Sequence, residues 1–186
     1  MMKVGCGNLY KGFKKGTIHS NLYIRSEGDN LLVVLVYVDD IIFGCTNESS
    51  VQWFSNSMQT EFEMSMIGEL SYFLGLQVKQ SSAGIFISQE KYLKEMLKKF
   101  QMDDSSLVST PMVVSCKLSK DDISPDVDQR THRSMIGSLL CITTSRPDIM
   151  QVVGMVGRFQ STPKQSHLAV VKRIFKYLKG TMTCGL

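Results

Sequence analysis

Two adjacent carboxylates stand between two apolar runs of the sequence. Asp39 and Asp40 follow the run 31–38 and precede the run 41–44. Because burying an unpaired carboxylate costs several kcal/mol even after relaxation, this placement predicts that both side chains reach solvent or a cation at the edge of a sheet. A divalent metal removes the repulsion between neighbouring carboxylates, and Mg²⁺ binds one or two carboxylates together with phosphates and water.

The Asp39-Asp40 pair has two interpretations. Aspartate is common in turns, so the pair can simply form the turn of a hairpin. A pair of Mg²⁺ ions held by these side chains can instead activate a hydroxyl nucleophile and stabilise the leaving oxygen in phosphoryl transfer. The two residues alone leave the plain turn and the metal site open.

The spacing of apolar residues predicts the elements that hold these aspartates. The runs 31–38 and 41–44 predict a β-hairpin with the aspartates at or beside its turn. A second hairpin is predicted over 74–88, and we expect both hairpins to share one antiparallel sheet, with a helix covering one face. Helical periodicity predicts five helices, over about 48–61, 89–100, 131–143, 148–159 and 163–180.

Local signals mark where helices begin. Asn47 is a candidate N-cap for the first helix, and Ser88 for the helix that follows the second hairpin. Before the last helix, Thr162 and Gln165 resemble a capping box, which puts Pro163 at the first helical position.

Composition places the chain among globular proteins. Of its 186 residues 43% are hydrophobic and 20% are charged, and the net charge of +4 is too small for binding driven by charge alone. The five cysteines are scattered without C-x-x-C spacing, which argues against a disulfide framework or a zinc ribbon. No signal peptide opens the chain, and no apolar run reaches the roughly 20 residues of a membrane helix. We therefore expect an intracellular protein without membrane partners, in a compartment that the sequence leaves open.

One acidic segment and two basic helical faces stand out in the second half of the chain. The segment 103–129 holds six aspartates and two lysines without periodicity, so it is predicted to be a linker or a surface excursion. Each basic face is interpreted either as the solvated side of a packed helix or as a surface that follows nucleic-acid phosphates. The cations concerned are Lys94 and Lys98 in one helix, and Lys172, Arg173, Lys176 and Lys179 in the last.

Short motifs in a fixed order connect the chain with a known family. They occupy residues 35–44, 62–64, 68–70, 72–78, 87–92, 109–111, 136–140, 144–149 and 171–181. Together they cover nearly the whole chain and resemble the reverse transcriptase of Ty1/copia-type retrotransposon Pol polyproteins. Within this series, Tyr37-Val38-Asp39-Asp40 resembles the palm-hairpin motif of reverse transcriptases.

The resemblance implies an α+β fold, with part of the palm at residues 1–87 and a helical thumb and connection region at residues 88–186. It also implies RNA-directed DNA polymerase chemistry, in which Asp39 binds two Mg²⁺ ions and Asp40 supports it. Tyr37 would lie near the primer end. Phe73-Leu74-Gly75 would form the primer-grip turn, or else a plain strand start with a structural glycine. The implied partner is a template–primer duplex of RNA or DNA.

The sequence lacks one part of this chemistry. The family uses three carboxylates, the third on an upstream palm strand, whereas the only acids before Asp39 are Glu27 and Asp29 in a turn-like cluster. We expect a chain that begins inside the palm, resembles a remnant of a decayed plant copia element, binds Mg²⁺ weakly or not at all, and is inactive alone. The upstream palm-and-fingers segment is a candidate partner. A non-catalytic nucleic-acid-binding module and an inert remnant remain alternatives, so whether the chain is itself an enzyme stays open.

Overall fold

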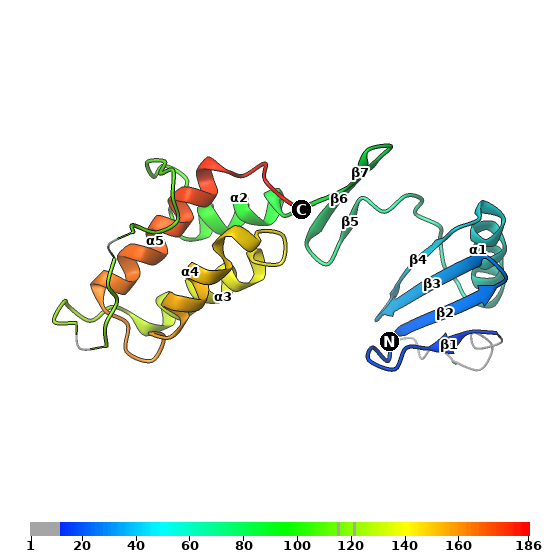
Figure 1. The fold of residues 1–186 in the computed structure, drawn as a ribbon, viewed down its shortest axis with the longest axis horizontal. Helices are drawn as coiled ribbons and strands as arrows, with labels where there is room; N and C mark the ends of the chain where they lie inside the picture. Colours follow the sequence, from blue (N-terminus) through cyan, green and yellow to red (C-terminus); the bar gives the residue numbers. More distant parts are fainter. Residues whose placement is uncertain (1–11, 115, 121) are drawn as a thin grey trace. The chain divides into compact units, whose positions relative to one another are not determined.

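A computed structural model describes residues 12–114, 116–120 and 122–186 of the chain. The chain divides into two compact units, Met1–Leu70 and Ser71–Leu186 (Figure 1). Both units contain antiparallel strands and helices, so the predicted α+β class is confirmed. No helix within the described ranges combines the length and the apolar character that crossing a bilayer requires.

The first unit is a four-stranded antiparallel sheet with one helix. The strands are β1 (Lys14–Lys15), β2 (Leu22–Glu27), β3 (Asn30–Tyr37) and β4 (Asp40–Cys45), and they pair in that order. The helix α1 (Glu48–Glu61) begins after Asn47, whose side-chain oxygen accepts a hydrogen bond from the Ser49 amide. This N-cap satisfies a free amide of the first turn, and the helix over 48–61 is confirmed.

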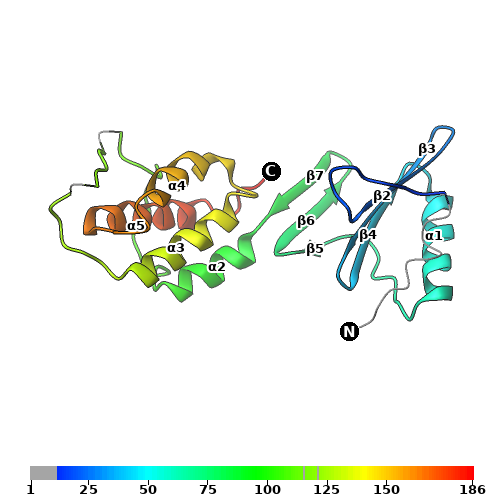
Figure 2. The same ribbon diagram turned by 90° about the horizontal axis from the view of Figure 1, so that it is seen from below.

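The apolar core of the first unit is one-sided in its described part. Alternation along β3 points Leu32 and Val34 toward α1, where they pack with the buried Phe54 and Met58. In Figure 2, α1 lies beside the strands β2, β3 and β4. Phe54 contacts Phe43, with ring centroids 4.8 Å apart. The opposite face carries half-buried aliphatic side chains from three strands, namely Leu22, Ile24, Val33, Leu35 and Ile42.

The second unit joins a small sheet to a bundle of helices. Three antiparallel strands pair in the order β5 (Tyr72–Phe73), β6 (Leu76–Ser81) and β7 (Gly84–Ser88). The helical elements are α2 (Glu90–Lys99), α3 (Gln129–Ile142), the 3₁₀ turn η1 (Pro147–Ile149), α4 (Met150–Gly157) and α5 (Gln165–Gly180). Their apolar stripes enclose a core in which Ile136, Leu139 and Phe175 are fully buried.

Contacts at Gln89 and at Ile87 help to attach the small sheet to the rest of the second unit. The side chain of Gln89, between β7 and α2, is buried and lies 2.8 Å from the Ser145 Oγ just after α3. Leu186 and Ile87 exchange two backbone hydrogen bonds of 2.8 and 2.9 Å. Gly185 permits this pairing, because a Cβ at that position would overlap the Ile87 carbonyl oxygen.

The acidic segment before α3 lies along α5 as a strap, which we define as the described residues between 105 and 127. Four pairs hold it, namely Ser105 with Lys179, Thr110 with Arg173, Ser119 with His167, and Asp126 with Lys164. As the residue numbers rise along the strap, the numbers of their partners on α5 fall, so the strap runs antiparallel to the helix (Figure 1). The segment is therefore a docked surface excursion rather than a free linker.

The two predicted hairpins do not share a sheet, which corrects the sequence prediction. Among the described strands, β1–β4 form one sheet and β5–β7 form another. Alternation along a strand assigns its two faces but does not identify its partner strand. The boundary between the compact units, at Leu70 and Ser71, places the second hairpin in the unit of the helices.

The predicted caps of two helices are also wrong. The last helix begins at Gln165, and its capping box joins Lys164 to His167, whose Nδ1 accepts the Lys164 amide at 3.0 Å. Gln89, rather than Ser88, precedes α2 and makes no side-chain cap. Thr162 and Gln165 have the right spacing, but His167 supplies a better placed acceptor.

Candidate functional site

The tip of the β3–β4 hairpin carries the two candidate metal ligands. Tyr37 pairs with Asp40, so Val38 and Asp39 are the two central residues of the turn. Val38 has a φ of 53°, a left-handed conformation that costs an L-residue about 1–2 kcal/mol. Asp39 and Asp40 are both exposed. The turn thus presents two adjacent carboxylates to solvent on a locally strained backbone.

The register of the hairpin decides which face of the sheet Asp40 occupies. Paired residues point to the same side, and successive residues point to opposite sides. Because Val36 packs toward α1, Tyr37 and its partner Asp40 lie on the other face. Asp40 and Tyr37 therefore share the face opposite α1.

The described residues supply only part of a Mg²⁺ site. Carboxylate oxygens are ligands that Mg²⁺ prefers, so Asp39 and Asp40 fit it chemically. No group of three His, Cys, Asp or Glu side chains able to hold a metal occurs in the ranges that the structure describes. Glu27 and Asp29 lie at the β2–β3 turn, the other end of β3, about 23 Å from Asp40 at the usual strand rise. They cannot complete the site, and Glu27 is paired with Arg25.

The turn that resembles the primer grip also holds residues at positive φ, as the β3–β4 turn does. Phe73 pairs with Leu76, so Leu74 and Gly75 are the two central residues. Their φ values are 49° and 82°, the combination found in a type I′ turn. A Cβ at Gly75 would meet nothing within 4 Å, so no close contact within the chain requires glycine there. Glycine is favoured at this position because its φ is positive. Leu74 is exposed at the tip.

The candidate phosphate-binding cations fall into two groups. On α5, Arg173 donates to the carbonyl and the hydroxyl of Thr110, and the Lys179 Nζ donates to the Ser105 carbonyl at 2.7 Å. On α2, Lys94 pairs with Glu90 across one helical turn. The cations outside these contacts are Lys98 and Lys172, which are exposed, and Lys176, which is half-buried. The strap therefore occupies part of the basic face of α5.

A family profile described as reverse transcriptase (RNA-dependent DNA polymerase) matches residues 3–114, which include both turns. The chain belongs to the reverse transcriptase family. This membership confirms the resemblance to copia-type retrotransposon polymerases. Reverse transcriptases generally use Mg²⁺ and bind a template–primer, so the exposed aspartates lie in a family whose chemistry needs such ligands.

The relatives of this reverse transcriptase chain include transposon polyproteins of plants. The chain is 31% identical to a retrovirus-related Pol polyprotein from transposon RE1 of Arabidopsis thaliana over 94% of its own length and 12% of the relative. It is 31% identical to the corresponding polyprotein from transposon TNT 1-94 of Nicotiana tabacum, over 84% of this chain and 12% of that one. An uncharacterized mitochondrial protein of Arabidopsis thaliana is 32% identical over 83% of this chain and 64% of its own. The chain thus spans about an eighth of the length of these polyproteins. No solved structure gave a significant match.

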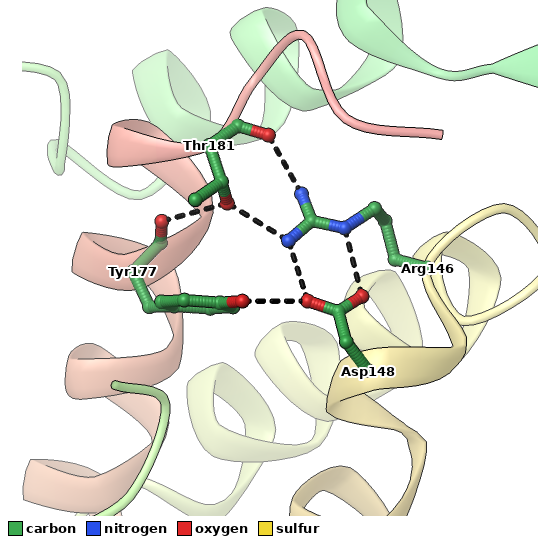
Figure 3. Close-up of polar contacts among 4 residues, drawn as sticks. All are labelled: Arg146, Asp148, Tyr177 and Thr181. Atoms are coloured by element: carbon green, nitrogen blue, oxygen red, sulfur yellow. Dashed lines mark hydrogen bonds and ion pairs between the residues drawn. The ribbon is translucent and has the colours of Figure 1, made fainter. Parts of the chain in front are cut away.

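A polar network around the buried Arg146 joins the 3₁₀ turn η1 to the end of α5 in this reverse transcriptase chain (Figure 3). The Arg146 side chain is only 5% exposed and makes a forked ion pair with Asp148, with contacts of 2.9 and 2.7 Å. It also donates to the carbonyl and the hydroxyl of Thr181 just after α5, both at 2.8 Å. Tyr177 donates to Asp148 at 2.8 Å. The hydrogen bond from Arg146 lowers the pKa of the Asp148 carboxyl.

The network fixes the end of α5, and therefore the segment that pairs with β7. Thr181 leads to Leu186, whose backbone pairs with Ile87. In the sequence, Arg146-Pro147-Asp148 looks like a local helix start, so its long-range role was not predicted. The signal that was available is the paired charge of Arg146 and Asp148 within residues 134–157, which contain no other charged side chain.

Proposed function

We propose that this chain supplies the metal-binding hairpin of an RNA-directed DNA polymerase whose remaining carboxylate lies on another segment of the polyprotein. The observation that carries the proposal is the β3–β4 turn, with Asp39 and Asp40 exposed and Glu27 and Asp29 at the far end of β3. Membership of the reverse transcriptase family supports it.

Asp39 and Asp40 would hold the ions, and the strained Val38 would fix the direction in which the turn presents them. Bound Mg²⁺ supplies activation of a hydroxyl nucleophile and stabilisation of the leaving oxygen. Tyr37, on the same face as Asp40, would support the primer end. With two ligands in place of three, the chain alone would bind Mg²⁺ weakly and would not align the reacting groups.

The test is primer extension by the chain, alone and mixed with the upstream segment of a related Pol polyprotein. We expect no extension by the chain alone and Mg²⁺-dependent extension by the mixture, lost on chelation of the metal. Asp39→Asn abolishes the restored activity, whereas Asp29→Asn, in the β2–β3 turn at the opposite end of β3, preserves it. Extension that survives Asp39→Asn would overturn the proposal.

A second candidate, nucleic-acid binding without catalysis, rests on the distribution of charge. Residues 1–70 contain five cations and eight acids, whereas residues 71–186 contain sixteen cations and nine acids. Six of those nine acids lie in the segment 103–129. The positive charge therefore lies in the unit of the helices, and binding that weakens steeply with salt would support this function.

A further inference from the structure

One face of the small sheet combines aromatic and basic side chains. The register places Tyr72, Gln77 and Ser88 in one row across the three strands, and Lys79 and Phe86 in the next row. Paired residues share a face, and residues two apart on a strand do as well. Tyr72, Lys79 and Phe86 therefore lie on the same side of the sheet.

The first turn of α2 extends this face. The Lys91 amide donates to the Gln77 Oε1 at 2.8 Å, and the Lys91 Nζ lies 5.7 Å from the centre of the Tyr72 ring. Lys94 follows almost one turn later on the same helix. We define the aromatic–lysine face as Tyr72, Lys79, Phe86, Lys91 and Lys94.

Most of the aromatic–lysine face is open to solvent, and Gly185 lies against the Phe86 ring. Tyr72 is 51% exposed and Phe86 is 37% exposed. The three lysines of the face are exposed as well. Its acidic neighbour is Glu90, whose pKa is lowered first by its hydrogen bond and charge interaction with Lys94, and more weakly by Lys79. Lys79 and Lys94 therefore both lie close enough to Glu90 to act on its carboxylate.

The basic face of α5 is less available. The strap occupies Lys164, Arg173 and Lys179 through Asp126, Thr110 and Ser105. A phosphate chain would have to displace these contacts to reach Lys164, Arg173 and Lys179, although Lys172 stays exposed. On the aromatic–lysine face the corresponding contact is the ion pair of Lys94 with Glu90, and a solvent-exposed pair of this kind is weak and easily exchanged for a phosphate.

We propose that the aromatic–lysine face binds single-stranded nucleic acid, with bases stacked on Tyr72 and Phe86 and phosphates on Lys79, Lys91 and Lys94. Aromatic rings accept unpaired bases, which a duplex keeps inside its own stack, and neighbouring lysines follow the backbone. This proposal rests on the nucleic-acid-binding part of the proposed function and names the surface and the form of the ligand.

The first experiment measures the anisotropy of a fluorescein-labelled oligothymidylate titrated with the full chain. Tyr72→Ala should weaken binding about tenfold, because stacking on one ring is lost. Tyr72→Phe keeps the ring and should bind as the wild type does. The matched control is Ile85→Ala, an exposed side chain on the opposite face of the same sheet, which should leave the affinity unchanged. Unchanged affinity in Tyr72→Ala would overturn the stacking role.

The second experiment measures how the affinity depends on salt. Removing two phosphate contacts in Lys79→Ala/Lys94→Ala should reduce the slope of log affinity against log salt by about 1.4, at about 0.7 for each contact to a single strand. Lys172→Ala/Lys176→Ala removes two cations of α5 and should leave the slope unchanged. A larger effect of the α5 variant, or tighter binding of a duplex than of the single strand, would contradict the proposal.

Failure here is distinguishable from failure of the catalytic proposal. Primer extension depends on Asp39 and is restored by an upstream segment, whereas oligothymidylate binding uses the chain alone and needs no metal. An Asp39→Asn chain should therefore bind the oligonucleotide as the wild type does. Loss of oligonucleotide binding in that variant would overturn the separation of the two sites.

Discussion

The two compact units bury their apolar residues in different ways. In the described part of the first unit, five buried residues form a core between one face of a sheet and α1. In the described residues of the second unit, sixteen buried residues are enclosed by α2, α3, α4 and α5. The candidate metal ligands thus lie on the unit with the thin core, and the candidate nucleic-acid surface lies on the unit with the closed core. We infer that the hairpin of the first unit depends more strongly on each of its packing contacts.

The largest expected effect tests this difference directly. Phe54 and Phe175 are both almost fully buried, and each packs against another ring, Phe43 and Phe100 respectively. Truncating a buried phenylalanine costs about 3–5 kcal/mol. We expect Phe54→Ala to abolish the hydrogen-exchange protection of β2–β4, because so few other contacts remain there. Phe175→Ala should lower protection throughout α2–α5 without removing it. Equal residual protection in the two variants would contradict the comparison.

A second substitution tests whether polar contacts contribute to the stability of the second unit, whose core is enclosed by helices. Arg146→Met removes the charged partner of Asp148, which keeps its hydrogen bond from Tyr177, and takes away the Arg146 donors to Thr181. Breaking a buried ion pair costs about 3–5 kcal/mol, and because Asp148 is 39% exposed we expect a loss of about 3 kcal/mol, measured by urea unfolding. Arg158→Met, at an exposed position just after α4, is the matched control and should change the stability by less than about 0.5 kcal/mol. A similar loss in both variants would show that the network does not stabilise the unit.

The helices were predictable from sequence because their signals are local. The apolar residues of α1 recur at helical spacing and Asn47 caps it, so both ends agree with the structure. The β3–β4 hairpin follows from two apolar runs separated by residues that favour turns. Family membership was predictable because the motifs keep their order along the chain.

Long-range pairing was not predictable from the sequence, and it accounts for the wrong assignment of the two hairpins to one sheet and for the contacts that were not foreseen. The strap is polar and aperiodic, which is typical of a linker, yet Thr110 meets Arg173 only after 63 residues of chain. The separate sheets follow from which strand pairs with which, and alternation does not encode that choice. The contact of Lys91 with Tyr72 was missed for the same reason, because a lysine on α2 and a tyrosine on β5 meet only through the fold.

A buried histidine makes the closed unit sensitive to acid. His132 is fully buried on α3, and neither ring nitrogen has a hydrogen-bond partner in the described part of the chain. Burial, and then the neighbouring His167, lowers the pKa of His132 below its usual 6.5. The unfolded chain therefore takes up a proton at a higher pH than the folded one does. Stability is fully present above about pH 6.5 and falls as the pH drops below that value toward the folded pKa.

Replacing His132 with an apolar residue tests whether its imidazole causes this dependence on pH. We expect His132→Leu to flatten the dependence of the melting temperature on pH between about 7.5 and 5.5. Without the imidazole, the unfolded chain no longer takes up a proton at this position that the folded chain lacks. His19→Leu, which changes an exposed histidine of the first unit, is the matched control and should leave the dependence in place. A wild-type melting temperature that is flat over this range would show that the closed core tolerates the charged imidazole.

The smallest effect concerns the two turns, where both units hold a bulky residue at positive φ. Val38 and Leu74 have φ values of 53° and 49° and are 77% and 55% exposed, so glycine at either position loses little burial. Relief of a left-handed residue is worth about 1–2 kcal/mol, and the greater freedom of glycine in the unfolded chain offsets about 0.5–1 kcal/mol of it. We expect both Val38→Gly and Leu74→Gly to stabilise their own unit by about 0.5 kcal/mol, with the larger gain at Val38 because its side chain is β-branched. Urea unfolding followed by hydrogen exchange of each unit measures both changes. Destabilisation by Val38→Gly would mean that the valine side chain packs in the turn and that its backbone is not strained. In that case the direction of Asp39 would be set by side-chain packing instead.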